Sequence, residues 1–331
     1  MEDKKTYNSL LAIYRIAAII MVLSVHVRGY LSGTPQVIDK LLGVGAYGVA
    51  LYFMLSGYFT YPSIKKSGEI PRYYAKRAVR ILPMYYISLL LTFIVGAVWL
   101  KIYPITWEWI YHVFFLNMFV PGKEWMWWNS VNYFWTMPAF AAWYIISPLF
   151  YIKVDTIRRM AVLTLISAAA APYIKKAMYL VAPEQFVNWN FFCLIYVFFL
   201  GVLAYLVVTD KKIKEGIIYG VLIGLAGVAA GNRSGFFIFG MLFYCMIICM
   251  SIRPLKLSGK LSGCINAFSS ITYSIYLTHW FVIQILGNYL STINWVAAYL
   301  LFLGICIIVG GCAYICIEKP IGRRLNGHKN V

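Results

Sequence analysis

The segment NSLLAIYRIAAIIMVLSVHVR, residues 8–28, decides the fold class of this chain. It is apolar over the roughly 20 residues that one helix needs to cross a bilayer. It also carries Arg15 and His26, eleven positions apart. At about 100° and 1.5 Å per residue, the two side chains share a helix face and lie about 16 Å apart along the axis. Ionisable residues are costly inside a membrane, so both are candidates for a functional site. The structural alternative is an arginine paired inside a helix bundle and a histidine near an interface.

The composition extends this interpretation to the whole chain. Of its 331 residues 62% are hydrophobic and 12% are charged, with a mean hydropathy of +0.75. Soluble domains carry about 25% charged residues. We therefore predict an all-α polytopic membrane protein, a single transmembrane domain over 1–331 with no separate soluble domain. The net charge of +18 does not indicate nucleic-acid binding. Most Lys and Arg residues lie between the apolar segments, as the positive-inside rule describes.

Ten apolar segments are long enough to be candidate spans. They are 8–28, 41–61, 82–100, 132–152, 160–182, 187–208, 216–231, 235–252, 265–287 and 293–317. With the N-terminus inside and 105–120 lying at the outer interface or re-entrant, most of the 29 Lys and Arg residues fall on the inner side. Ten spans also place both termini in the cytoplasm, in a multi-pass protein of the cell membrane. Arg15 is then nearer the inner side and His26 nearer the outer end of the first helix.

A basic segment follows the second span. Arg77 and Arg80 are three positions apart and so share one helix face. Guanidinium groups match the geometry of phosphate oxygens, so the pair is a candidate phosphate site. Positive-inside charge in contact with lipid headgroups is the alternative.

Three further polar residues lie in or beside apolar segments. Ser56 follows Gly48 in a small-residue stretch, where helix packing explains it better than nucleophilic catalysis, since no activating base is evident nearby. His279 is a second histidine in a predicted span, either functional or hydrogen-bonded across helices. Glu318 is the carboxylate at the inner end of the last span, and it either orients an inner arginine or is plain helix-end charge.

Together these motifs resemble the acyltransferase-3 family of integral membrane acyltransferases. The resemblance rests on Arg15-x10-His26, Gly48-Val49 with Phe53-Met-Leu-Ser-Gly-Tyr58, Arg77-x-x-Arg80-Ile-x-Pro83, Tyr276-Leu-x-His279 and Glu318-x-Pro320, in family order over nearly the whole chain. Of these motifs only Arg-x10-His is specific alone. The family's architecture of ten spans agrees with the segments counted above.

One stretch departs from the family pattern. Many members carry Trp-Ser-Leu-x-Val-Glu-x-Gln-Phe-Tyr in mid-chain, whereas this chain reads Trp135-Thr-Met-Pro-Ala-Phe140-Ala-Ala-Trp143-Tyr144. Phe140 stands where the glutamate would be. Acceptor specificity therefore does not carry over from members that bear the glutamate, although Tyr144 is retained as a supporting residue.

The resemblance implies an O-acyltransferase that modifies envelope polysaccharides or other sugars, with acetyl-CoA as donor substrate and no metal. On this hypothesis Arg77 and Arg80 hold CoA phosphates at the inner mouth, and Arg15 lies along the pantetheine arm. His26 acts on the acceptor hydroxyl as a general base or carries the acyl group covalently. Ser56, Tyr144, His279 and Glu318 support them.

Two other functions remain compatible with the sequence. A non-catalytic transport or binding domain would use the intramembrane arginine to bind the carboxylate of a small solute such as an amino acid. A flippase for lipid-linked sugars would also be polytopic and basic. The flippase hypothesis does not explain the full set of family motifs, whereas some members of the resembled family appear as membrane domains beside amino-acid racemases.

Overall fold

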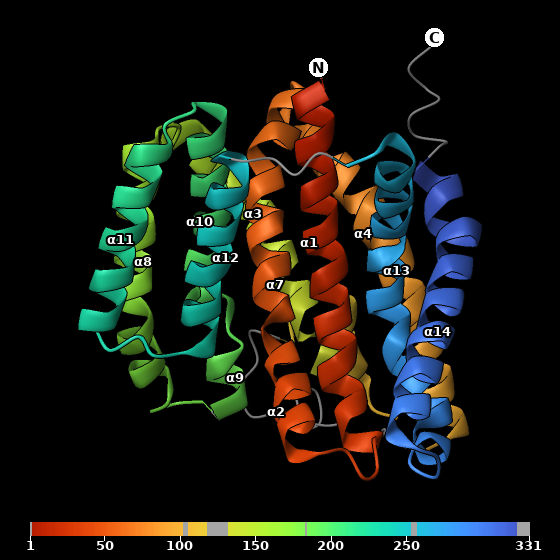
Figure 1. Ribbon diagram of the computed structural model, residues 1–331. Helices are drawn as coiled ribbons and strands as arrows, with labels where there is room; N and C mark the ends of the chain where they lie inside the picture. The colour runs from red at the N-terminus through yellow and green to blue at the C-terminus, as the bar shows by residue number, and fades with distance from the viewer. Residues whose placement is uncertain (1, 102–104, 118–131, 183, 253–256, 323–331) are drawn as a thin grey trace. The chain divides into compact units, whose positions relative to one another are not determined.

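The computed structural model describes residues 2–101, 105–117, 132–182, 184–252 and 257–322, and within these ranges all regular structure is helical. The longer helices in Figure 1 are α1 (Glu2–Val27), α2 (Gln36–Val44), α3 (Gly48–Ser67), α4 (Ile70–Thr92), α7 (Thr136–Lys153), α8 (Ile157–Met178), α10 (Phe191–Thr209), α11 (Ile213–Ala229), α12 (Gly235–Ile252), α13 (Gly259–Leu290) and α14 (Trp295–Ala313). Short helices are α5 (Ile110–Val113) and α9 (Glu184–Asn188), and π-helical turns extend α4 over Phe93–Trp99 and α14 over Tyr314–Glu318. The prediction of an all-α chain is confirmed for the described residues.

Seven helical stretches of the described residues are long and apolar enough to cross a membrane. They are Leu10–Tyr30, Gln36–Ser67, Ile70–Trp99, Ile157–Met178, Phe186–Thr209, Gly235–Ile252 and Trp295–Gly322. The other three predicted spans correspond to α7, α11 and α13, which are helical but not among the seven. α11 has only 17 residues, and the N-terminal half of α13 carries many polar side chains. The count of ten spans and the side of the termini stay predictions.

Polar side chains begin several of these helices. Thr156, Asn190, Ser258 and Asn294 precede α8, α10, α13 and α14, and each side-chain oxygen accepts a hydrogen bond from a backbone N–H of the first turn. Such N-caps satisfy amide groups that have no partner within the helix. The helix boundaries are therefore set locally, by residues that can be found in the sequence.

The chain folds as two compact units, each assembled from segments that are separate in sequence. The first comprises Met1–Leu11, Val49–Tyr74 and Phe114–Leu257, and the second comprises Ala12–Gly48, Ala75–Val113 and Ser258–Val331. The first thus holds α3 and α7 to α12, while the second holds α2, α13, α14 and most of α1 and α4.

α10 is the core helix of the first unit. It packs against α7, α8, α11 and α12, and most of its residues are buried. Gly57 of α3 faces the backbone of Phe198, and Gly201 of α10 faces the backbone of Met54. A side chain at either glycine would collide with a carbonyl group, so these two positions let α3 and α10 approach closely, as small residues do in membrane bundles.

α13 is the helix around which the second unit is built. It packs against α14, where Gly310 lies against the backbone of Ile275. Ser88 of α4 donates a hydrogen bond of 2.5 Å to the carbonyl oxygen of Leu277. Ser24 of α1 bonds to the Tyr299 hydroxyl of α14 at 2.8 Å. Polar contacts therefore join α4 to α13 and α1 to α14, in addition to packing.

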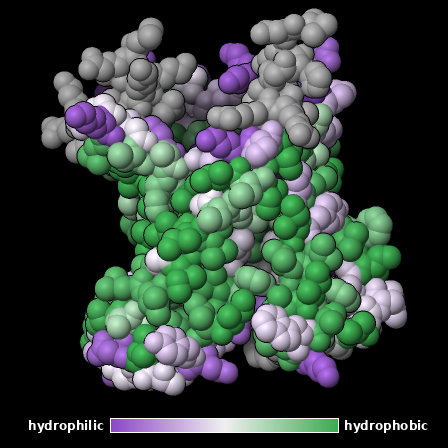
Figure 2. All heavy atoms as spheres, turned by 90° about the vertical axis from the view of Figure 1, so that its right-hand side faces the viewer, coloured by the Kyte–Doolittle hydropathy of each residue, from purple (hydrophilic) through white to green (hydrophobic). Residues whose placement is uncertain are grey.

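The face that carries α14 is largely apolar. Figure 2 shows a broad hydrophobic band across the face that carries α14, with hydrophilic residues toward its two ends. Leu300 and Ile308 of α14 are 61% and 65% exposed. Apolar side chains exposed over a whole helix face are expected when the solvent is lipid.

Candidate functional site

The second unit contains most of the residues predicted to act in a site. These are Arg15, His26, Arg77, Arg80, His279 and Glu318, whereas Ser56 and Tyr144 belong to the first unit. The six come from three stretches far apart in sequence that fold into one unit. Within this unit the predicted residues form two separate groups. The residues of one group lie around His26, and those of the other lie around Glu318.

His26 lies near the end of α1 with two aromatic neighbours from α13. Its ring centroid is 5.0 Å from that of His279, with an interplanar angle of 40°. The Trp280 ring is 5.1 Å away and nearly perpendicular, at 86°. His26 keeps part of its surface accessible, whereas His279 is fully buried. Of the two histidines, His26 is therefore the more accessible residue.

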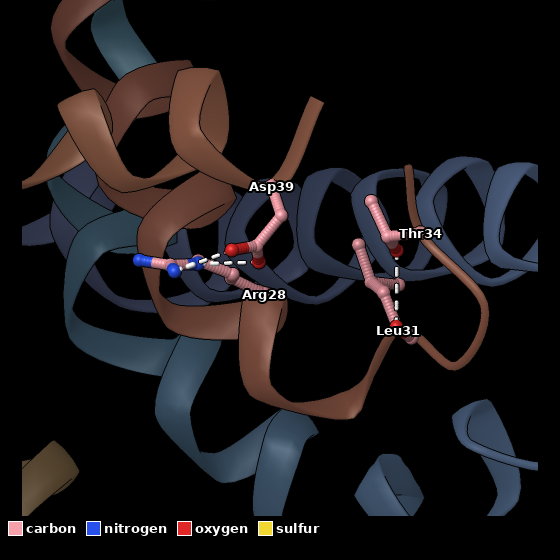
Figure 3. Close-up of polar contacts among 4 residues, drawn as sticks. All are labelled: Arg28, Leu31, Thr34 and Asp39. Atoms are coloured by element: carbon pink, nitrogen blue, oxygen red, sulfur yellow. Dashed lines mark hydrogen bonds and ion pairs between the residues drawn. The ribbon is translucent and has the colours of Figure 1, made fainter. Parts of the chain in front are cut away.

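The chain that follows His26 is held by an ion pair. Nε and Nη2 of Arg28 each donate to a carboxylate oxygen of Asp39, both at 2.5 Å, and the two side chains face each other in Figure 3. Thr34 closes the same turn with a bond of 3.0 Å to the carbonyl oxygen of Leu31. A bidentate pair fixes direction as well as distance. Arg28 lies two residues after His26, and its positive charge is paired with the Asp39 carboxylate.

The second group joins α13, α14 and α4. Ser274 donates a hydrogen bond of 2.8 Å to the Glu318 carboxylate, and Arg80 lies near enough for its charge to act on that carboxylate. Glu318 is the last residue of a π-helical turn, a local distortion that frequently marks functional sites. Both roles expected for Glu318 stay predictions, and the nearness of Arg80 is compatible with the orienting role.

Arg15 and Arg77 lie on the same two helices as the residues just described. Arg15 and His26 are on one continuous helix, α1, as the sequence predicts. Arg77 and Arg80 are one turn apart on α4, with Arg77 partly buried and Arg80 exposed at the surface. The exposed guanidinium of Arg80 can meet an anionic ligand that arrives from water. The partly buried guanidinium of Arg77 lies one turn away on the same helix.

Ser56 and Tyr144 form a separate pair in the first unit. Their hydroxyl oxygens are 2.5 Å apart, and Phe140, one turn before Tyr144, packs on Phe53 with ring centroids 5.1 Å apart. The position where many relatives carry a glutamate is thus filled by an aromatic cluster. Ser56 thus has the Tyr144 hydroxyl as a neighbour, and its packing role stays a prediction.

His112 is a second fully buried histidine, on α5 of the second unit. Its side chain is 0% exposed, and its carbonyl oxygen accepts a hydrogen bond of 2.7 Å from Tyr85. Burial lowers the pKa of His112 to about 3. It therefore stays neutral at ordinary pH, and no prediction assigned it a role.

Sequence reasoning missed two features of this site. Trp280 directly follows the Tyr276-Leu-x-His279 motif and Ser274 lies two residues before it, and neither was assigned a role. The only signal for Ser274 was its place five residues before His279 on one helix, and its partner Glu318 is 44 positions away. No three His, Cys, Asp or Glu side chains of the described ranges gather into a group that could hold a metal ion.

Several apolar helices long enough to cross a membrane indicate a multi-pass membrane protein, and one of its units holds most of the predicted site residues. Residues 11–316 match the acyltransferase domain model of the acyltransferase-3 family, so the chain belongs to this family of membrane acyltransferases. No curated protein and no solved structure shows a significant match to the chain.

Proposed function

We propose that the chain transfers an acetyl group from cytoplasmic acetyl-CoA to a hydroxyl group of an extracytoplasmic sugar or envelope polysaccharide. It works as a multi-pass protein of the cell membrane with its N-terminus inside. The observation that carries the proposal is the gathering of Arg15, His26, Arg80 and Glu318 in one unit of a chain that belongs to the acyltransferase-3 family.

Arg77 and Arg80 bind the phosphates of the donor in this proposal. A nucleotide with several negative charges stays on the aqueous side, while its thin thioester arm reaches into the protein. The proximity of Glu318 to Arg80 supports this role, because a carboxylate held by Ser274 orients the guanidinium before the ligand arrives. Arg15, on the face of α1 that leads to His26, lies along the arm.

His26 acts at the acceptor end. In direct transfer it takes the proton of the acceptor hydroxyl while the oxygen attacks the thioester carbon. The C–O bond forms, the C–S bond breaks, and the proton ends on the CoA thiolate. In the covalent variant an imidazole nitrogen of His26 first takes the acetyl group and then passes it to the hydroxyl. The half-buried position of His26 is compatible with both.

The test uses membranes from cells that express the full chain, supplied with acetyl-CoA labelled in the acetyl group. We expect label in the glycan fraction with the wild type and its loss, by roughly 100-fold or more, with His26→Ala. His112→Gln is the matched control, since it changes another buried histidine of the same unit and should keep the activity.

Three outcomes would contradict the proposal. One is normal labelling with His26→Ala, and another is equal loss with His112→Gln. The third is no acetyl transfer by the wild type together with uptake of a labelled amino acid, which would favour a transport domain. Label that stays on the chain at His26 would identify the covalent variant.

A further inference from the structure

His279 has no task in the scheme above, although its ring lies beside that of His26 from a distant part of the sequence. Its centroid lies 5.0 Å from that of His26, and its side chain is 0% exposed. A fully buried imidazole does not meet a substrate directly. If it contributes to catalysis, it does so through His26.

The hydrogen bond at Nδ1 decides which tautomer His279 adopts. Nδ1 lies 2.5 Å from the carbonyl oxygen of Tyr276, one turn earlier on α13. A carbonyl oxygen only accepts hydrogen bonds, so Nδ1 of the neutral ring must carry the proton and donate it. Nε2 of His279 then presents a lone pair, and it can only accept. In other histidine sites too, the hydrogen bond at one ring nitrogen decides whether the other nitrogen carries a proton.

The spacing of the rings fits a contact through nitrogen atoms. Two imidazoles joined by one N–H···N bond of about 2.9 Å have centroids roughly 5 Å apart. Trp280 stands with its ring nearly perpendicular to His26, which restricts how far the His26 ring can turn. The planes of the two histidine rings are tilted by 40° to each other.

We propose that His279 is a positioning residue for His26: its Nε2 accepts the N–H of His26 and so turns the other, unprotonated nitrogen of His26 toward the acceptor hydroxyl. The arrangement runs from the Tyr276 carbonyl through His279 to His26. It is the order of orienting group, base and nucleophile found in catalytic triads, with a neutral imidazole as the orienting group.

The proton balance of the reaction is unchanged by this role. His26 takes one proton from the acceptor hydroxyl and becomes an imidazolium with two N–H groups. One of these stays bonded to Nε2 of His279, which stabilises the charge while the C–O bond forms. The other proton goes to the CoA thiolate when the C–S bond breaks. His279 remains neutral throughout.

The inference rests on the proposed function, and a double-mutant cycle separates the two. The four proteins are the wild type, His279→Leu, His26→Ala and the double variant, all full-length in membranes with labelled acetyl-CoA. We expect His279→Leu to lower kcat about 100-fold with little change in the KM for acetyl-CoA. In the His26→Ala background the same substitution should change the residual rate less than about twofold, because the residue acts only through His26.

A conservative variant distinguishes positioning from packing. The amide oxygen of His279→Gln can accept a hydrogen bond, whereas the side chain of His279→Leu cannot. We expect the Gln variant to be at least about fivefold faster than the Leu variant, with both extracted as monodisperse protein in amounts equal to the wild type. Equal rates for the two variants, or a full effect of about 100-fold from His279→Leu on top of His26→Ala, would overturn the role of His279.

Failure of the proposed function looks different. A wild type that transfers no acetyl group overturns the proposed function and this inference together. A wild type that does transfer, accompanied by His279→Leu with at least half of its kcat, overturns the inference alone.

Discussion

Ser274 on α13 donates a hydrogen bond of 2.8 Å to the carboxylate of Glu318 on the π-helical turn after α14. The pair links two packed helices at the point where Arg80 of α4 comes near. A carboxylate inside a membrane bundle is costly unless hydrogen bonds or a cation stabilise it. Ser274 supplies the hydrogen bond and Arg80 the cation. The role of the Glu318 carboxylate can therefore be tested by removing its charge while keeping its hydrogen bond.

Glu318→Gln separates the charge of Glu318 from its hydrogen bond. The amide oxygen still accepts from Ser274, but the negative charge near Arg80 is gone. We expect the apparent KM for acetyl-CoA to rise about fivefold, equivalent to about 1 kcal/mol, with kcat nearly unchanged. Ser274→Ala keeps the charge and is the control. A larger KM effect in Ser274→Ala than in Glu318→Gln would contradict the orienting role.

Arg77→Ala and Arg80→Ala test the phosphate site. Losing a charge-assisted contact should raise the KM for acetyl-CoA about tenfold in each variant. S-acetylpantetheine lacks the nucleotide and its phosphates, so with this donor the variants and the wild type should have equal KM values. Lys66→Ala, at the end of α3, controls for general loss of positive charge. A KM effect that persists with the short donor would rule out phosphate binding.

Ser56→Ala and Tyr144→Phe test whether the hydroxyl pair of the first unit has a chemical role. Removal of one hydroxyl breaks the 2.5 Å contact and should lower the free energy of unfolding by about 1 kcal/mol. The two changes together should cost less than their sum, because they break the same bond. Acetyl transfer should stay above half of the wild-type rate. Loss of transfer in a normally folded Ser56→Ala protein would show that Ser56 is a nucleophile.

Gly57→Ala and Gly201→Ala test the close approach of α3 and α10. In each variant the new methyl group meets a backbone carbonyl of the other helix, so the helices must separate. We expect a loss of about 2 kcal/mol or more, measured as a lower midpoint of thermal unfolding in detergent. Gly304→Ala is the matched control, since a Cβ there meets no atom within 4 Å. Unchanged midpoints at positions 57 and 201 would mean that the helices are not in direct contact.

His112→Gln tests a pH dependence of stability. The pKa of His112 is about 3 in the folded chain because of burial, and it takes the usual value of 6.5 in the unfolded chain. Below pH 6.5 the unfolded chain therefore binds a proton that the folded chain does not. This lowers the stability by about 1.4 kcal/mol per pH unit until about pH 3. α5 is not part of the candidate spans.

The measurement for His112 compares thermal unfolding in detergent at about pH 7.5 and about pH 5.5, on either side of the usual histidine pKa. The wild type should lose more stability over this interval than His112→Gln does. Equal losses in the two proteins would mean that His112 is not the group responsible.

Much of the fold could be predicted from local sequence. Each of the ten predicted segments overlaps a helix of the structure, because apolar length and helix-starting residues such as Asn190 and Ser258 act within one stretch of chain. Residues 105–117, the described part of the stretch 105–120 that was predicted not to span, contain only short helical turns, and the prediction itself stays untested. The π-helical turn that ends at Glu318 and contacts α13 carried no such signal.

The sequence by itself determined the membrane-protein class, the helical segments and the candidate residues, since hydrophobic length, helical period and the cost of buried charge are properties of a single segment. Only the tertiary structure decided which candidates meet. His26 lies beside His279 and Trp280, and Glu318 lies beside Ser274, across separations that no helical period spans. Ser56 and Tyr144 instead bond to each other in the other unit. The physical reason is that contacts between helices depend on how whole faces pack, which the order of residues along one helix does not specify.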